Sequence, residues 1–316
     1  MDKISVKIIE QNECTGGYSN SNIKIELNNI TFHYANMLRR VLKTYIPTYA
    51  YSKVTIVKNT GILNNDQIRE RFMNIPVMYI KNDEKTVLQF LDLYNGKSVN
   101  ENHLSMYINY KNKTGKLAMV TTDMAKFYLD GTEIKSPYKK PLLLLKLNND
   151  EEFECTCQSQ LGLNLEEQYE SPAIYDPVAG CAYEQVEENK FILNFETNQQ
   201  FSEKEALRRA ISCLLIRLEF LNNMVKEKVN PESEKEGILN IPNEDMTLGG
   251  ILGYLLQMHE SVEFAGDHQP NISMRTLQIR YKCKKSMTDI FDECIDKLSK
   301  SLKSMAKQLK LELIEH

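Results

Sequence analysis

The residues that could carry out chemistry are few, and their spacing favours none of the common sites. Cys155 and Cys157 lie in an alternating segment, so both thiols would share one face of a strand. Since no second pair of cysteines or histidines follows at ligand spacing, we expect core packing rather than a zinc site. The 5 histidines form neither a His-x-x-x-His nor a His-Glu-x-x-His pattern. The sequence therefore predicts no catalytic residue, no metal and no cofactor.

Three glycines, Gly249, Gly250 and Gly253, fall at the start of a predicted helix, where a phosphate could bind. No Lys-Ser or Lys-Thr pair follows them directly, as it would in a P-loop, and no acidic residue stands at Rossmann spacing after a strand. These glycines instead indicate a helix that packs closely against its neighbour.

The composition excludes several classes of protein. The 316 residues carry 39 Lys and Arg against 43 Asp and Glu, a net charge of −4, which does not suit a free-standing nucleic-acid binder. Hydrophobic residues make up 42%, as in ordinary folded chains. The longest apolar run, 142–145, is too short to span a bilayer, and the first residues do not form a signal peptide. We expect an intracellular protein that does not bind membranes.

The charges are unevenly distributed. Between Lys146 and Lys190 there is no Lys or Arg, whereas acidic residues accumulate from Asp150 to Glu188. This acidic block 150–188 is either a solvated face or a docking surface for a basic protein partner.

Helical periodicity predicts the elements that position the remaining residues. Residues 31–45 form an amphipathic helix that Pro47 ends, and Ser202 begins a long helix with apolar side chains on two faces. Thr247 is the expected cap of a short helix through Leu256. A strand at 276–283 and a final helix from Ser286 to about 310 complete the pattern.

These elements form a weak internal repeat of a strand, a short helix, a strand and a long helix. The fold class is therefore α+β, with two units that pack about a pseudo-two-fold axis. We expect a first unit at 1–46 and 185–231, an inserted mainly β domain at 47–184, and a second unit at 232–316. The expected interface and core residues are Leu38, Leu42, Leu214, Ile216, Phe220, Leu252, Leu256, Phe291, Leu298 and Leu302.

One face of the first helix lies opposite its apolar stripe. It carries His33, Met37 and Arg40, with Arg39 on the flank. This face is either solvated or a partner surface, because arginine beside exposed methionine is typical of protein interfaces.

The chain resembles the alpha-like subunits of multisubunit DNA-directed RNA polymerases. Segment 29–48 is similar to the alpha motif, with Ala-Asn-Met-Leu-Arg-Arg at 35–40 and Pro-Thr at 47–48. Segments 69–77 and 169–179 resemble further motifs of the larger subunit. Segments 243–250 and 262–270 resemble the small partner, the eukaryotic eleventh subunit or archaeal subunit L. The two matches follow one another in a single chain, as in the fused subunits of large cytoplasmic DNA viruses.

Three positions depart from the motifs of the small partner. Met246 replaces the expected His, Gly250 the Asn and Asp267 the Tyr. The insert also lacks the cysteine cluster that holds zinc or iron–sulfur in some relatives.

The resemblance implies a non-catalytic assembly platform of a DNA-dependent RNA polymerase. Its implied partners are the largest, second-largest and small polymerase subunits, with DNA reached only through the complex and no homo-oligomer. Arg40 matches the residue that contacts the second-largest subunit in the family, and Arg39, Met37 and His33 would complete that surface. A viral source implies the host cytoplasm and the virion, and otherwise the nucleus. The alternatives are a regulatory interaction module or a stand-alone enzyme on the same fold.

Overall fold

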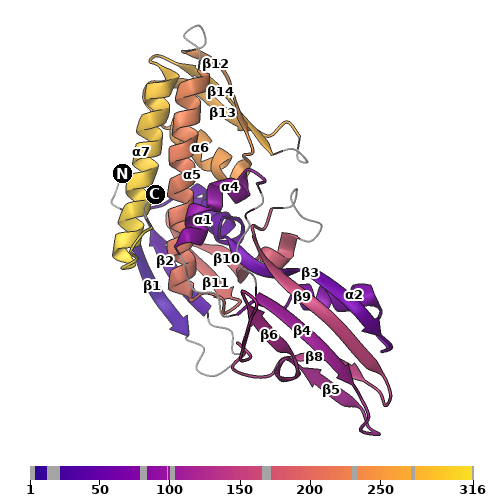
Figure 1. Ribbon diagram of the computed structural model, residues 1–316. Coiled ribbons are helices and arrows are strands. Elements are labelled where there is room, and N and C mark those ends of the chain that lie inside the picture. The colour runs from indigo at the N-terminus through magenta and orange to yellow at the C-terminus, as the bar shows by residue number, and fades with distance from the viewer. Residues whose placement is uncertain are drawn as a thin grey trace.

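The computed structural model describes residues 4–12, 22–78, 84–97, 99, 104–165, 172–229, 234–271 and 275–314. It contains two sheet-and-helix units and a β-rich part that projects away from both (Figure 1). The helices of the two units pack against each other, with α5 along α7 and α1 across α6. The α+β class with two repeated units and an insertion is confirmed.

The first unit is a four-stranded antiparallel sheet covered on one face by helices. Its strands run in the order β1-β2-β11-β10. Alternate side chains on neighbouring strands, such as Ile25 opposite Leu193, are buried beneath the helices. The elements are β1 (Ser5–Asn12), β2 (Asn22–Asn28), α1 (Phe32–Thr44), β10 (Val178–Glu187), β11 (Lys190–Thr197) and α5 (Glu203–Lys228).

The second unit repeats this topology with one strand fewer. Its sheet has the order β12-β14-β13, which corresponds to β2-β11-β10, and no equivalent of β1 is present among the described residues. The elements are β12 (Glu236–Pro242), α6 (Met246–Gln257), β13 (Val262–His268), β14 (Thr276–Cys283) and α7 (Met287–Gln308).

The repeat is in register at the level of single residues. The first strand and helix of each unit start 214 positions apart, at 22 and 236 for the strands and at 32 and 246 for the helices. Between them, Asn29 and Asn243 adopt left-handed backbone angles, with φ of 59° and 55°. Asparagine tolerates this region better than other non-glycine residues. Thr31 and Asp245 then occupy the same N-cap position.

The insertion between α1 and β10 is mainly β. Its five-stranded sheet has the order β3-β9-β4-β6-β7, and a two-stranded sheet, β5-β8, lies at its far end (Figure 1). Its elements are β3 (Thr48–Asn59), α2 (Asn65–Met73), α3 (Lys85–Leu88), α4 (Phe90–Tyr94), β4 (Leu104–Lys111), β5 (Ala118–Thr121), β6 (Lys126–Leu129), β7 (Thr132–Ile134), β8 (Leu143–Leu147) and β9 (Glu152–Gly162).

Of the expected domain boundaries, one is wrong and another lies outside the described residues. The boundary expected between 184 and 185 was wrong, because it cuts through β10, which pairs with β11 in the first sheet. Strand β10 is an edge strand with mostly exposed side chains, so it lacks the apolar alternation that would have marked it. The boundary expected near 232 lies outside the described residues.

One expected helix cap also differs. The short helix α6 is capped by Asp245, whose side chain accepts a hydrogen bond from the backbone N–H of Thr247. The hydroxyl of Thr247 instead accepts a hydrogen bond from Arg40 of the first unit. Thr247 was therefore wrongly expected to be the cap: both residue types can cap a helix, and the aspartate two residues earlier is the more favoured one.

Two carboxylates of the described part of the acidic block 150–188 form ion pairs within the chain. Glu152 pairs with Lys58 and Lys111 within the inserted sheet, and Asp176 pairs with Lys43 of α1 at 3.5 Å. These two carboxylates are therefore paired internally and not available to a partner.

The glycines of α6 pack closely at two of their three positions. A Cβ on Gly249 would lie 2.7 Å from Leu277, and one on Gly253 would lie 2.1 Å from Asp267. The nearest atom to a Cβ on Gly250 would be His33 at 4.0 Å. Close packing is thus confirmed for Gly249 and Gly253, whereas Gly250 has room for a side chain.

We predict opposite effects for two glycine substitutions in this helix. Gly253→Ala should lower the free energy of unfolding by about 1–3 kcal/mol, because Asp267 would have to move. Gly250→Ala is the matched control, and should be neutral or stabilising by up to about 1 kcal/mol, because alanine favours helices. Chemical denaturation of both variants tests this, and equal stability of the two would contradict the packing described.

Candidate assembly interface

The face of α1 that was expected to point outward instead packs on the second unit. Met37 is only 1% exposed. His33 stacks on Tyr254 of α6, with ring centroids 4.6 Å apart. The outward placement of these residues was wrong because α1 lies between its own sheet and α6, so both of its faces are covered. A helical wheel alone cannot distinguish a partner within the chain from a separate one.

Arg40 bridges the two units at the start of α6. Its Nε donates a hydrogen bond to the Thr247 hydroxyl at 2.7 Å, and its Nη2 pairs with Asp245 at 3.2 Å. The side chain remains 34% exposed, so one edge of the guanidinium is accessible. Its neighbour Arg39 donates two hydrogen bonds to Asn36 on its own helix and is half-buried.

A fully buried ion pair lies at the centre of the interface. Arg217 of α5 donates to a carboxylate oxygen of Glu244 at 2.9 Å, and both side chains are 0% exposed. Arg217 also donates to the backbone carbonyl of Asn243 at 3.0 Å, and its guanidinium lies 4.4 Å from the ring centre of Tyr94. Buried charges are tolerated only when they are paired and hydrogen-bonded in this way.

Two tyrosines complete the surroundings of Glu244. The hydroxyls of Tyr45 and Tyr94 donate to its second carboxylate oxygen at 3.3 Å and 3.1 Å. Burial and the nearby Glu244 carboxylate raise the pKa of both tyrosines, which therefore stay protonated and act as donors. The guanidinium of Arg275 covers the ring of Tyr94 at 4.3 Å.

This cluster joins three parts of the chain. Tyr45 and Arg217 belong to the first unit, Tyr94 to α4 of the insertion, and Glu244 to the loop before α6 in the second unit. These residues were not predicted from the sequence. A single arginine within the apolar stretch of α5, and the glutamate directly before the α6 cap, were the available signals.

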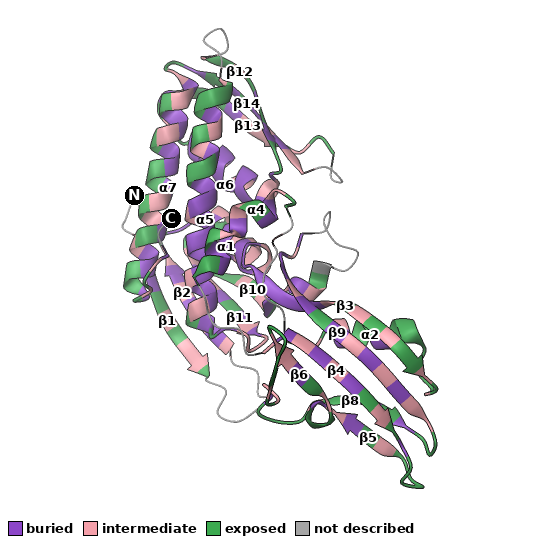
Figure 2. Cartoon of the chain, in the orientation of Figure 1, coloured by how far each residue is buried: buried purple, intermediate pink, exposed green. Residues whose placement is uncertain are grey.

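The apolar residues expected at the interface and in the core are nearly all buried. Phe220 is the exception at 38% exposure, and its ring centre lies 5.2 Å from the buried Arg217 guanidinium. The pattern of burial along α5 and α7 follows the seam between them (Figure 2). The buried members are Leu38, Leu42, Leu214, Ile216, Leu252, Leu256, Phe291, Leu298 and Leu302.

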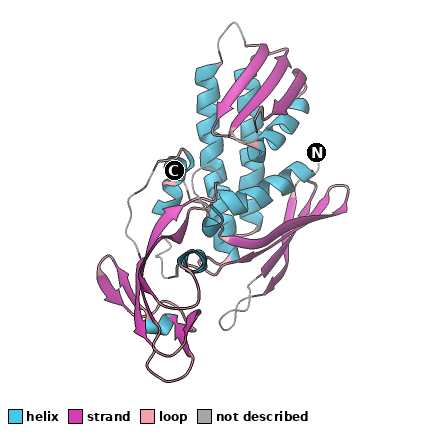
Figure 3. Cartoon of the chain, turned by 90° about the vertical axis from the view of Figure 1, so that its right-hand side faces the viewer, coloured by secondary structure: helices cyan, strands magenta, loops and turns pink. Residues whose placement is uncertain are grey.

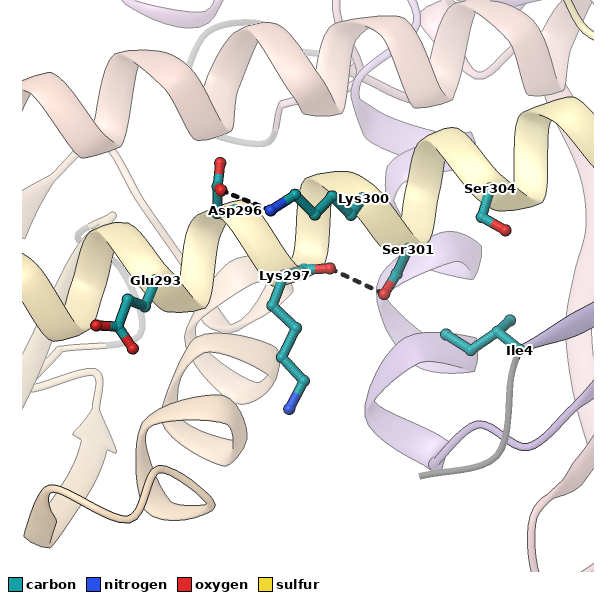
Figure 4. Close-up of a pocket in the computed structure, with 7 residues that line it drawn as sticks. All are labelled: Ile4, Glu293, Asp296, Lys297, Lys300, Ser301 and Ser304. Carbon is teal, nitrogen blue, oxygen red and sulfur yellow. Dashed lines mark hydrogen bonds and ion pairs between the residues drawn. The ribbon is translucent and has the colours of Figure 1, made fainter.

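The surface groove along α7 does not assemble reactive groups. It has a volume of about 500 Å³ and is lined by Ile4 and by polar residues of α7 (Figure 4). Asp296 pairs with Lys300 at 2.9 Å, and the Ser301 hydroxyl donates to the backbone carbonyl of Lys297. The side chain of Lys297 points away from both pairs (Figure 4). No nucleophile is placed beside a base in this groove.

The described part of the chain contains neither a cluster of three or more metal-ligating side chains nor a helix that could span a membrane. The Cys155 and Cys157 sulfurs lie 3.8 Å apart in the core, and no third ligand joins them among the described residues. Within the same residues, no helix combines the length and apolar character needed to cross a membrane.

Comparison with known proteins explains the two repeated units. Residues 24–217 match the RNA polymerase Rpb3/Rpb11 dimerisation domain, and residues 236–308 match it a second time. The chain belongs to the Rpb3/Rpb11 dimerisation family. The two members that pair in this family are therefore present here as consecutive halves of one chain, as the resemblance predicted.

Two relatives of this Rpb3/Rpb11-type subunit support the assignment. A protein of Acanthamoeba polyphaga mimivirus, named as a DNA-directed RNA polymerase subunit, is 22% identical over 96% of this chain and 93% of its own length. The Dictyostelium discoideum DNA-directed RNA polymerases I and III subunit rpac1 is 25% identical over 46% of this chain and 45% of its own. The chain is thus a non-catalytic assembly subunit of a DNA-directed RNA polymerase and associates with other polymerase subunits.

We predict that the buried ion pair is required for the two halves to pack. Arg217→Ala should lower the free energy of unfolding by about 3–5 kcal/mol, because Glu244 would be left buried without its cation. The double variant Arg217→Met with Glu244→Leu should recover part of this loss. Lys300→Ala, which removes an exposed pair, is the control and should leave the denaturation midpoint unchanged. A mild effect of Arg217→Ala would contradict the central role of the pair.

We also predict that Arg40 contributes to the stability of the folded chain in a pH-dependent way. Burial alone would raise the pKa of Asp245, but hydrogen bonds from Thr247 and the charge of Arg40 hold this pKa below its ordinary value. A lowered folded pKa stabilises the protein above the pKa of the unfolded chain, about 3.9, and this stabilisation is lost as pH falls through the folded pKa.

Arg40→Ala should therefore cost about 1 kcal/mol at neutral pH, with a smaller difference from the unmodified chain below about pH 4. Arg39→Ala is the matched control, because among the described residues the Arg39 side chain hydrogen-bonds Asn36 on its own helix and no residue of the second unit. Denaturation midpoints of the isolated chain over this pH range measure both. A cost for Arg40→Ala that does not change with pH would contradict the pairing with Asp245.

Proposed function

We propose that this chain is the platform on which the second-largest polymerase subunit docks, in place of a pair of separate alpha-like chains. The observation that supports this is the internal interface, in which α1 and α5 of the first half pack on α6 and α7 of the second. Since the buried Arg217–Glu244 pair already joins the halves, no second alpha-like chain is needed to complete them. We accordingly propose that the free subunit does not form homo-oligomers.

The proposed docking surface is the accessible rim of α1. It consists of Arg39, Asn36 and the exposed edge of Arg40, since Met37 is buried and His33 is stacked on Tyr254. Arginine guanidinium groups that keep free N–H donors at a rim can pair with carboxylates or carbonyl groups of a partner. The similarity of segment 29–48 to the alpha motif supports the same surface.

The similarity to the mimivirus protein along nearly the whole chain supports a role in viral transcription. We propose that the subunit acts with the largest, second-largest and small subunits of such a polymerase, in the host cytoplasm and in the virion. Contact with DNA would be indirect, through those subunits.

A co-purification experiment tests the docking proposal. A tagged chain is co-expressed with the two large subunits of its polymerase, and their recovery is measured by quantitative mass spectrometry. Arg39→Ala and Arg40→Ala should each lower recovery of the second-largest subunit, because truncating a charge paired at an interface costs about 2–5 kcal/mol. Lys300→Ala should not.

The stability of each variant is measured in parallel, so that a folding defect is distinguished from a binding defect. Full recovery of the second-largest subunit with both arginine variants would contradict the proposed surface. Recovery of the tagged chain alone, without either large subunit, would contradict the platform role itself.

A further inference from the structure

The two units differ at one edge of their sheets. In the first unit, β1 pairs with β2 along its whole length in antiparallel orientation. In the second unit, the equivalent strand β12 is the last in its sheet, and no described strand pairs with its outer side (Figure 3). An exposed strand edge offers unpaired N–H and C=O groups to another extended chain.

The chain itself cannot fill this edge as it does in the first unit. Strand β1 and its connection to β2 occupy residues 5–21, whereas residues 229–235 alone connect α5 with β12. This connection is too short to supply a strand and a return turn. The N-terminal strand is already committed to β2, where the side chain of Gln308 bonds the backbone of Ile4 and Val6.

The backbone groups that face the open edge can be identified. The N–H of Cys283 bonds the carbonyl of Lys235, so Gly237, Leu239 and Ile241 are the β12 residues bonded to β14. In an antiparallel ladder the intervening residues direct their N–H and C=O groups to the other side. These are Ile238 and Asn240 in the centre of the strand.

The side chains at this edge also differ between the units. Lys24 of β2 pairs with Glu10 of β1 at 2.6 Å, so a charged pair joins these strands. The equivalent residue in β12 is Ile238, which is 49% exposed. Opposite Ile238 on β14 is Arg280, which is exposed and forms no ion pair with the described residues. An apolar side chain has thus replaced a charged one, beside a cation that is free to pair.

We infer that β12 accepts an extended segment of one of the two large polymerase subunits, which adds as an antiparallel fourth strand where β1 adds in the first unit. The segment carries an apolar side chain beside Ile238 and an acidic side chain on the same face that reaches Arg280. Main-chain hydrogen bonds supply affinity in this mode of binding, and alternate side chains supply specificity. This inference rests on the proposed function, since it takes its partner from the same polymerase.

Hydrogen exchange measures the edge directly. The free chain is compared with the complex purified after co-expression with the two large subunits. The amides of Ile238 and Asn240 should exchange at least about tenfold more slowly in the complex, because they become hydrogen-bonded. The amides of Leu239 and Ile241, bonded to β14 in both states, are internal controls. Unchanged exchange at 238 and 240 in an intact complex would overturn the inference while leaving the proposed function standing.

A proline substitution provides the second test. Ile238→Pro removes an outward N–H and leaves the bonds to β14, so the free chain should keep its thermal midpoint. In the co-purification experiment, recovery of the large subunit that supplies the added strand should fall about tenfold or more. Lys24→Pro, at the equivalent position, should destabilise the free chain because β1 already pairs there.

Phe264→Ala removes an exposed aromatic side chain from the opposite edge strand β13 and should leave assembly unchanged. Loss of assembly with Phe264→Ala but not with Ile238→Pro would show that the partner covers the face of the sheet, and would overturn strand addition. If wild-type chain recovers no large subunit, the proposed function fails and this inference fails with it.

Discussion

The structure depends on one constraint, which is that each unit has a helix layer with two apolar faces. One face of α1 and α5 covers the first sheet, and the other must be covered by something else. In this chain α6 and α7 of the second unit cover the second face of α1 and α5. The second apolar face of α6 and α7 is in turn covered by α1 and α5. Neither half buries its helices alone, so each half depends on the other to cover the second apolar face of its helix layer.

The Arg217–Glu244 pair adds specificity to this apolar contact. Apolar faces alone allow several ways of packing, whereas a buried pair whose partners come from different units tolerates only one. Tyr94 brings the insertion into the same cluster, so that the β-rich part is held at the junction and not only at its two ends. Closer to the surface, Arg40 forms a second ion pair between the two units, with Asp245 at the N-terminus of α6.

The sequence predicted the helices and the repeat well, because they depend on local periodicity. Helices α1, α5 and α7 begin one residue after the expected positions 31, 202 and 286, and strand β14 has the expected bounds. The surroundings of α1 could not be predicted, because a face buried by a distant segment has the same composition as one buried by a separate partner. Strand β10 was missed for a related reason, since its membership of the sheet depends on pairing with β11 and not on its own side chains.

Because the two alpha-like halves are fused here, one copy of this chain should replace a pair of separate alpha-like chains in the polymerase. Native mass spectrometry of the polymerase purified through this subunit measures the stoichiometry directly. We expect one copy of the chain for each copy of the two largest subunits, with no separate Rpb3-like or Rpb11-like chain. Two copies of the chain, or one copy with an additional alpha-like partner, would contradict it.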